Sequence, residues 1–313
     1  MKRNLFNILY LLILIIIMTD VIINSNMIMK TVTFSFNLWF NNIIPSLFPF
    51  FILSELLIKF GFVEIISEIL KKPIYYLFKV KKEASFVFIM SMLTGFPSSS
   101  KYVKELFLDN KISSDEASKI LMFTHFSNPL FIIGTIATTF LNNQKMGLSI
   151  LFAHYISNII IGFLFRNYKP YKYIEKTNIK KAFNEIKPRE NMGLILSKAI
   201  FNSFKTLFLI LGIVIIFLCL TNLISYHLQL SPLKDGLLKG LFEMTQGLKY
   251  ISLLNISLKW KIIISAMIIS FGGISVHAQI IGILGDTNIK YLPFLIARII
   301  HMILAGLIVY LLI

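Results

Sequence analysis

The chain has 313 residues, of which 56% are hydrophobic and only 15% are charged, and its mean hydropathy is +0.77. An ordinary soluble domain carries about a quarter charged residues, so this composition excludes a typical soluble globular protein. Apolar runs long enough to cross a bilayer recur along the chain, and they predict an all-α polytopic membrane protein.

The formal net charge of +16 does not indicate a nucleic-acid partner, because no basic soluble domain remains once the apolar segments are set aside. Lysine and arginine gather instead in short connections, as the positive-inside rule expects of cytoplasmic loops. The single cysteine, Cys219, rules out an internal disulfide and argues against a cysteine-based metal site. We expect a surrounding lipid bilayer, no nucleic acid, no metal and no cofactor.

The N-terminal residues 1–30 are predicted to hold one membrane span, at about 5–23. Lys2 and Arg3 precede this span, which predicts a cytoplasmic N-terminus. No small-x-small cleavage site follows the apolar run, so we interpret it as an uncleaved span rather than a signal peptide.

Residues 31–60 are apolar but too long and too interrupted for one plain helix. A proline inside a helix removes a backbone hydrogen bond and clashes with the preceding turn, so we expect the helix to break. The interrupting residues are Asn41, Asn42, Pro45 and Pro49. Glu55 lies in the apolar remainder and is a candidate for binding a coupling ion, with a position at the membrane interface as the alternative.

An apolar arm at 84–93 runs into a polar break at 95–100, and a second arm continues to residue 107. Ten helical residues cover roughly half of a ~30 Å hydrocarbon core, so the break falls at mid-membrane depth. Irregular backbone survives there only where protein buries it or where it lines a watery cavity. We therefore predict a re-entrant hairpin over 84–107, with Gly95 and Pro97 as its structural turn.

Three hydroxyls follow this turn, on Ser98, Ser99 and Ser100. They are candidates for binding a polar solute, and capping of the broken helix ends is the equally weighted alternative. A helix end at this depth would also favour an anionic group through its partial positive charge.

The distribution of basic loops favours a hairpin that does not cross the membrane. The lysine-rich loop at 71–82 and the basic segment at 166–190 should both be cytoplasmic. Two clear spans, near 120–141 and 148–165, lie between them, so a single crossing by 84–107 would put one basic loop outside. We interpret 166–190 as a cytoplasmic linker between two halves.

Ser113 or Ser114 is expected to cap a helix that runs through Asn128 and Pro129 to about residue 141. Asn128 is a substrate-binding candidate, because a kink at this pair would line a cavity. A simple bend before proline is the alternative.

The second half, residues 191–313, holds a span at 201–224, a weakly apolar stretch at 237–254 and a final span at 291–313. Glu243, in the weakly apolar stretch, is the second ion-coupling candidate. Residues 262–286 form another interrupted apolar segment, which we predict to be a second hairpin. Its break carries two structural glycines and three solute-binding candidates: Gly272, Gly273, Ser275, His277 and Gln279.

The two interrupted segments resemble each other at an offset of 177, which sets Gly95 on Gly272 and Ser98 on Ser275. Three predicted spans separate the copies, so the second hairpin should enter from the opposite membrane face. Broken segments in corresponding positions of inverted halves point to a transport site at the midplane. The expected fold therefore has two inverted-topology halves, each with a re-entrant or broken helical hairpin.

Four blocks of the sequence resemble, in the same order, the sporulation integral membrane protein family called YlbJ. They are Asn42-Ile43-Ile44-Pro45-Ser46-Leu47-Phe48-Pro49-Phe50-Phe51, Gly95-Phe96-Pro97 with Lys101, Ala153-His154-Tyr155-Ile156-Ser157, and Gly272-Gly273-Ile274-Ser275-Val276-His277-Ala278-Gln279. The resemblance implies paired nucleoside recognition, or Gate, domains, which here would be 31–165 and 191–313. It also implies a role in forming the endospore, in the cell membrane of a bacterium.

Together these features favour a permease, passive or ion-coupled, for a small polar solute that is nucleoside-like or related to the cell wall. A non-transporting membrane scaffold for spore cortex or envelope assembly is the alternative, in which the basic loops would dock other proteins. A second copy of the chain and other spore-envelope proteins are further candidate partners.

Enzymatic activity is not expected. Lys101 follows Ser98 by three residues, as in a serine–lysine dyad, but no nucleophile elbow accompanies the pair. We expect this lysine to extend toward the cytoplasmic surface. The chain also lacks HExxH, CxxC, Walker A and GxGxxG motifs.

Overall fold

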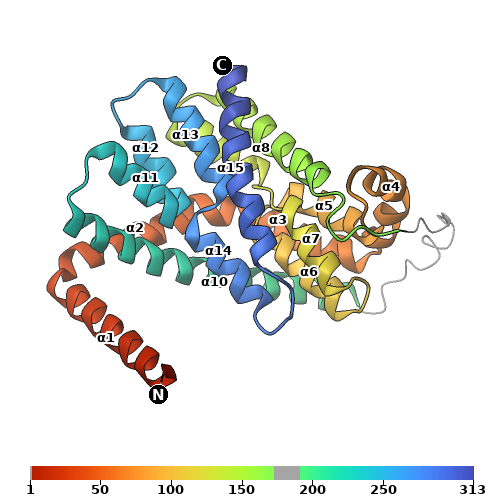
Figure 1. Cartoon of the computed structure of the whole chain (residues 1–313), viewed down its shortest axis with the longest axis horizontal. Coiled ribbons are helices and arrows are strands. Elements are labelled where there is room, and N and C mark those ends of the chain that lie inside the picture. The colour runs from red at the N-terminus through yellow and green to blue at the C-terminus, as the bar shows by residue number, and fades with distance from the viewer. Residues whose placement is uncertain (1, 173–190) are drawn as a thin grey trace.

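The computed structural model describes residues 2–172 and 191–313, so most of the predicted linker at 166–190 lies outside the described residues. The part of the chain that it describes is helical, without a β-strand (Figure 1). The first half contains α1 (Lys2–Ile23), α2 (Ser25–Leu38), η1 (Trp39–Ile43), α3 (Ile44–Lys59), α4 (Phe62–Phe78), α5 (Glu83–Thr94), α6 (Ser98–Leu108), α7 (Ser114–Phe123), η2 (Phe131–Phe140) and α8 (Gln144–Leu164). The second half contains α10 (Met192–Leu228), α11 (Pro232–Phe242), α12 (Met244–Leu253), α13 (Leu258–Phe271), α14 (Gly273–Leu284) and α15 (Leu292–Leu312).

Six helices within the described ranges are long and apolar enough to cross a membrane. They are Phe6–Ile23, Ser25–Lys59, Gln144–Leu164, Met192–Leu228, Leu258–Leu284 and Leu292–Leu312. The prediction of an all-helical polytopic membrane protein is confirmed.

The predicted break in 31–60 is wrong, because Ser25–Lys59 is one continuous helical span. A π-helical turn, η1, lies in its middle and contains Asn41 and Asn42. Such a turn shifts the backbone hydrogen bonds by one residue and so absorbs an irregularity without ending the helix. Pro45 follows in the first turn of α3, where a missing N–H costs little.

The long helix α10 packs along this span. The Trp39 indole Nε1 donates to the carbonyl oxygen of Leu207 at 3.0 Å, and a separate apolar cluster, with Phe51 and Leu211 among its members, fills the contact. The first helix, α1, projects away from the rest of the chain (Figure 1), and its apolar window has no buried residue.

Helices α5 and α6 form a hairpin whose two ends meet. Lys81, just before α5, donates from Nζ to the carbonyl oxygen of Lys111, just after α6, at 3.2 Å. Gly95 at the turn has a φ of +77°, and a Cβ on it would lie 2.7 Å from the backbone nitrogen of Asn128. Glycine is required here both by the backbone conformation and by the close approach of residues 124–128.

A second hairpin is formed by α11 and α12, and the sequence reasoning did not identify it. The two helices pack so closely that a Cβ on Gly247 would lie 2.2 Å from the Cα atom of Gly240. Farther from the turn, a Cβ on Gly236 would touch the side chains of Ile251 and Tyr250. The chain therefore turns back on itself at Glu243.

The predicted break at Gly272 is confirmed, since α13 ends there with a φ of +91°. The predicted hairpin over 262–286 is wrong. Lys259, in the first turn of α13, contacts the Tyr310 ring near the C-terminal end of α15, whereas residues 286–291 join the end of α14 to the start of α15. The interrupted segment therefore runs the full length of α15, about 30 Å for 21 residues.

The same order of elements occurs twice: a helical hairpin, an interrupted helix pair and a 21-residue helix. The two long helices begin at Gln144 and at Leu292, 148 positions apart. The predicted offset of 177 is therefore wrong, because it sets a hairpin on an interrupted helix. Asp286, at the end of the second interrupted segment, lies 3.0 Å from Lys104 of α6, the helix that Asp109 follows. Both segments therefore end on the same side of the molecule. This contradicts the prediction that the second hairpin enters from the opposite membrane face.

Helix α7 begins at the predicted cap. The Ser113 hydroxyl accepts from the Glu116 backbone N–H, and the Glu116 carboxylate accepts from the Ser113 backbone N–H, so both halves of a capping box are present. The prediction that this helix continues to residue 141 is wrong, because residues 124–128 are not helical. Pro129 disfavours helical backbone at Asn128, and partners described below satisfy the exposed carbonyls.

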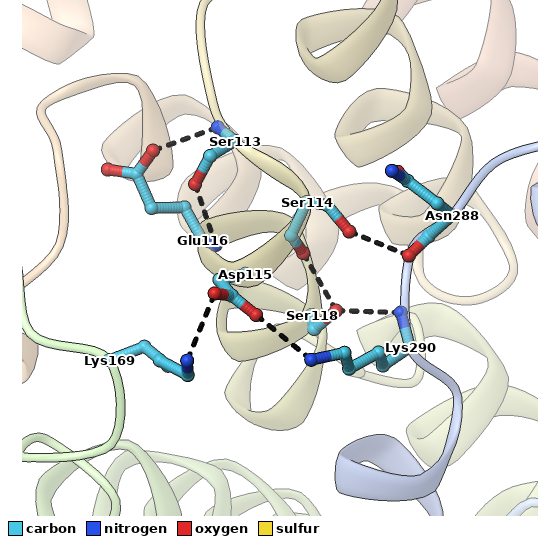
Figure 2. A network of polar contacts seen from close by, with 8 residues as sticks. All are labelled: Ser113, Ser114, Asp115, Glu116, Ser118, Lys169, Asn288 and Lys290. Atoms are coloured by element: carbon cyan, nitrogen blue, oxygen red, sulfur yellow. Dashed lines mark hydrogen bonds and ion pairs between the residues drawn. The ribbon is translucent and has the colours of Figure 1, made fainter.

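The N-terminus of α7 joins three parts of the chain (Figure 2). The Asp115 carboxylate contacts Lys169, which follows α8, at 3.2 Å and Lys290, which precedes α15, at 3.4 Å. The Ser114 hydroxyl donates to the carbonyl oxygen of Asn288 at 2.7 Å. These contacts hold the connections of both halves against one another at one end of the molecule.

Replacing Asp115 with Asn should remove an acid-sensitive part of the stability. The hydrogen bond from Lys169, with a second from Lys290, holds the pKa of Asp115 below its ordinary 3.8. A depressed carboxyl pKa stabilises the folded state above the unfolded pKa, and that stability is lost as the pH falls through the folded value. The melting temperatures of the parent and Asp115→Asn proteins should therefore differ near neutral pH and converge below about pH 3.8. A constant difference down to pH 3 would contradict this assignment.

Candidate functional site

A small cavity of about 40 Å³ lies where the hairpins and the interrupted helices meet. Its walls come from the turn of the first hairpin, residues 127–131, the turn of the second hairpin, α14, and the spans Ser25–Lys59 and α10. Its polar lining is Ser46, Ser127, Asn128, Glu243, Thr245 and Gln279. Three of the predicted site residues, Asn128, Glu243 and Gln279, are therefore brought together.

Asn128 closes the first interrupted helix. Its amide Nδ2 donates to the carbonyl oxygen of Leu93 near the end of α5 at 2.9 Å, and its Oδ1 accepts from the backbone N–H of Leu130 at 2.7 Å. One side chain thus satisfies a helix end and a helix start while it lines the cavity. Both the proposed solute contact and the structural alternative fit this residue.

Glu243 is almost fully buried at the turn of the second hairpin. Its Oε2 accepts from the backbone N–H of Gln246 at 2.8 Å and its Oε1 accepts from the Thr245 hydroxyl at 3.1 Å, so the carboxylate caps α12. Among the residues described, no cationic side chain pairs with it. A buried carboxyl group without a cationic partner is costly to ionise.

Each hairpin turn packs on one interrupted helix. Gly95 lies against Asn128, as described above, and a Cβ on Gly273 would lie 3.0 Å from the backbone nitrogen of Met244. The hydroxyls of Ser99 and Ser275, one beside each turn or break, are buried without a hydrogen-bond partner. The convergence of two turns and two breaks is a geometric property of the fold that sequence spacing alone did not reveal.

The other predicted residues lie away from the cavity lining. His277 is hydrogen-bonded at both ring nitrogens, through Nδ1 to the Tyr291 hydroxyl at 2.6 Å and through Nε2 to the carbonyl oxygen of Phe271 at 3.1 Å. The Ser100 hydroxyl donates to the carbonyl oxygen of Pro97 at 2.7 Å, within the first turn of α6. Both side chains therefore have hydrogen-bond partners within the fold.

Glu55 forms an ion pair with Lys101, so the two ionisable residues that the sequence treated separately are partners. The pair lies beside Ser98 and Tyr102 in a second, smaller depression. An exposed or partly buried pair of this kind contributes little to stability, but it neutralises both charges inside an apolar region. The Lys101 side chain therefore contacts Glu55, whereas we had expected it to extend toward the cytoplasmic surface.

The residue that sequence reasoning missed is Arg298, which is completely buried in α15. Its guanidinium donates to the carbonyl oxygen of Met122 and to Asn158 Oδ1 at 2.9 Å, and it contacts His301 Nδ1 at 2.6 Å. The Met122 carbonyl belongs to the last turn of α7, where helix carbonyls lack partners and attract positive charge. An arginine in an otherwise apolar span was itself a signal, because intramembrane ionisable residues are functional candidates by default.

Two histidines complete the support of the first break. The backbone N–H of Ser127 donates to His154 Nε2 at 2.8 Å, and His154 Nδ1 lies 2.9 Å from the Ser270 hydroxyl of α13. His125 stacks on Phe96 of the first hairpin turn at 4.6 Å between ring centroids, and both its ring nitrogens are buried without partners. His125 and His154 thus lie at the same break.

No cluster of three or more histidine, cysteine or acidic side chains suited to a metal occurs within residues 2–172 and 191–313. The cavity instead offers hydroxyl, amide and carboxylate groups, which suit hydrogen bonding to a polar solute.

No family profile and no solved structure match this chain. The chain is 35% identical over 307 aligned residues to the sporulation integral membrane protein YlbJ of Bacillus subtilis (strain 168). The alignment covers 88% of this chain and 75% of that relative. The chain therefore belongs to the YlbJ family of sporulation integral membrane proteins.

Proposed function

We propose that the chain is a permease that carries a small polar solute across a membrane during endospore formation, and that the cavity between the hairpin turns is its solute site. The observation that carries the proposal is the convergence of two turns and two interrupted helices on one small, mainly apolar cavity that carries a few polar groups. Broken helices at membrane depth supply backbone groups for a ligand, and transporters built from repeats use them in this way.

The buried carboxyl group at the cavity supports a site for a polar solute. Glu243 lines the cavity and has no cationic partner among the described residues. The cavity of about 40 Å³ has room for only a few water molecules. Solute binding must therefore accompany an opening of the hairpin turns.

The proposed topology places the end with Lys81, Lys111 and Lys169 in the cytoplasm, with the N-terminus on the same side, as the positive-inside rule favours. Helix α8 runs toward this end and α15 runs away from it, since Lys290 contacts Asp115 there. Under this topology both hairpins are re-entrant and the halves are inverted, with the second hairpin at α11–α12.

The test is thermal unfolding of the purified protein against nucleosides, nucleobases, cell-wall precursors and simple ions. A ligand at a hundred times its dissociation constant should add about 2.7 kcal/mol to a reversible unfolding free energy. Thr245→Val and Gln279→Leu, which remove polar groups from the cavity, should abolish the shift. Thr139→Val, on the exposed face of η2, should keep it. If the ligand still raises the unfolding free energy of both cavity variants, the cavity is not the solute site.

A scaffold for spore cortex or envelope assembly is the second candidate, and the isolated position of α1 favours it (Figure 1). This candidate also draws on the basic residues Lys180, Lys181 and Lys187, which lie outside the described residues. If the scaffold is correct, no solute will shift the unfolding transition, and deletion of residues 1–23 or neutralisation of these lysines will impair spore formation more than cavity variants do.

A further inference from the structure

A second, open groove of about 550 Å³ lies between α2, α10 and α12. Its polar lining is Asn26, Lys30, Thr31, Asn222, Gln246, Lys249 and Tyr250. The groove lies at the end of the molecule that carries the connections from α10 to α11 and from α12 to α13, opposite the Lys81–Lys111 end. It is more than ten times the volume of the closed cavity.

The groove and the cavity are separated by one turn of helix. Gln246 lines the groove, whereas its neighbour Thr245 lines the cavity. Gln246 also receives the Glu243 carboxylate on its backbone N–H, so this turn is the capped start of α12. Any route from the groove to the cavity must pass this turn.

A chain of hydrogen bonds across three helices holds the turn in place. Gln246 Nε2 donates to Asn222 Oδ1 at 2.8 Å, and Asn222 Nδ2 donates to the Thr31 hydroxyl at 2.9 Å. The Gln246 Oε1 atom is buried and has no partner. The link from α12 to the long spans thus includes two hydrogen bonds, and Lys249 of α12 also lies over the Phe34 ring of α2 at 4.8 Å.

On its other sides the cavity is bounded by Ile43, Leu47, Phe96 and Phe131 among other apolar side chains. Separating apolar surfaces exposes them, whereas a hydrogen-bonded link exchanges its partners for water at a net cost of about 1 kcal/mol per bond. The turn that carries Thr245 and Gln246, between the cavity and the groove, is therefore the side that opens most easily to water.

We propose that the groove is the entrance to the solute site from this side and that the Thr31–Asn222–Gln246 link is the gate that closes it. This inference rests on the proposed permease function. Opening breaks the two hydrogen bonds, moves the start of α12 away from α10 and α2, and joins the groove to the cavity beside Glu243. Gln246 and Asn222 act by positioning α12.

The lone cysteine makes a direct test possible. In a Cys219→Ala background, Thr245→Cys places one thiol in the cavity, and its rate of modification by a charged methanethiosulfonate reagent in detergent reports how often the gate opens. Gln246→Ala removes one bond of the link and should raise the rate about fivefold, and Asn222→Ala removes two and should raise it by more. The measurement requires no knowledge of the solute.

Matched variants separate gating from general loosening. Asn202→Ala changes the same residue type on α10 at an exposed position outside the groove, and it should leave the rate unchanged. A thiol introduced by Lys249→Cys, in the open groove, should react rapidly in every background and gives the rate of an accessible thiol, while thermal unfolding verifies that each variant is folded. Gln246→Met preserves the side-chain length without the bond and should behave like Gln246→Ala.

An unchanged Thr245→Cys rate in both Gln246→Ala and Asn222→Ala would overturn the gate, as would a rate that Asn202→Ala raises equally. Because no solute is present, this failure is distinct from a failure of the permease proposal, which the solute panel tests separately. A Lys249→Cys thiol that reacts as slowly as the thiol in the cavity would overturn the groove as an entrance.

Discussion

Replacing Arg298 with Leu should lower the unfolding free energy by about 3 kcal/mol. The substitution leaves the Met122 carbonyl oxygen and Asn158 Oδ1 buried without their donor, and it removes the contact with His301. Leucine recovers part of the cost of burying a charge, but a buried acceptor left unsatisfied loses about 1–3 kcal/mol, and two are left here. The net effect is therefore strongly destabilising.

The loss should fall on the first interrupted helix. The His125 carbonyl oxygen accepts from Arg298 Nη1 at 3.4 Å and from Asn158 Nδ2 at 2.8 Å. The second donor remains in Arg298→Leu, so residues 124–128 should loosen rather than unfold separately. The measurement is the midpoint of thermal unfolding in detergent, together with the solute-induced shift. Arg298→Lys, which keeps the charge but not the planar fork, should recover only part of the stability.

Lys290→Met is the matched control for Arg298→Leu. Lys290 lies just before the same helix, but its side chain is exposed and its pair with Asp115 is solvent-screened, so its loss should cost well under about 1 kcal/mol. Equal destabilisation by Arg298→Leu and Lys290→Met would show that the buried guanidinium is not the support of the first break.

Local chemistry made some of this fold predictable. Apolar length and loop charge identified the membrane helices, and a serine three positions before a glutamate identified the start of α7. The turn at Gly95 was also recognisable, because the backbone there needs glycine. Each of these features is determined by neighbours in sequence.

The direction of the chain after a break was not predictable, because it depends on distant partners. Gly272 resembles Gly95, yet the chain turns back after Gly95 and continues along α15 after Gly272. The second hairpin turns at Glu243 without a glycine or proline at the turn. The sequence therefore showed only a weakly apolar stretch at 237–254. The glycines of α11 and α12 indicate this hairpin, because they allow the two helices to pack closely. That role is visible only when the two helices are known to be paired.

The candidate site illustrates the same limit. His277 was a candidate for binding the solute, and in the fold its two ring nitrogens contact the Tyr291 hydroxyl and the Phe271 carbonyl oxygen. Glu55 and Lys101 are 46 positions apart, and their pairing could not be read from spacing. Residue type identified polar groups at membrane depth, whereas the fold decided which of them face a cavity.

Replacing Gly247 with Ala should destabilise the protein by about 3 kcal/mol, at the upper end of the usual cost of overpacking. The added Cβ would lie 2.2 Å from the Cα atom and 2.3 Å from the backbone nitrogen of Gly240. Both atoms belong to the backbone, so no side-chain rotation relieves the clash and the two helices must separate. Thermal unfolding of the purified variant measures the loss.

The same separation should disturb the site, because the turn between these helices carries Glu243 and Thr245. We therefore expect Gly247→Ala to weaken the solute-induced shift and to speed modification of a Thr245→Cys thiol. A stable variant with unchanged thiol reactivity would mean that α11 and α12 do not pack as closely in the membrane as they do here.

Gly282→Ala and Gly212→Ala are the controls, since a Cβ at either position meets nothing within 4 Å. Both glycines lie inside helices, where alanine is favoured by up to about 1 kcal/mol, so these variants should be neutral or slightly more stable. The three substitutions are chemically identical and differ only in the space around the new methyl group. Opposite signs of the stability change would therefore assign the loss at Gly247 to helix contact in the second hairpin, and equal signs would contradict that packing.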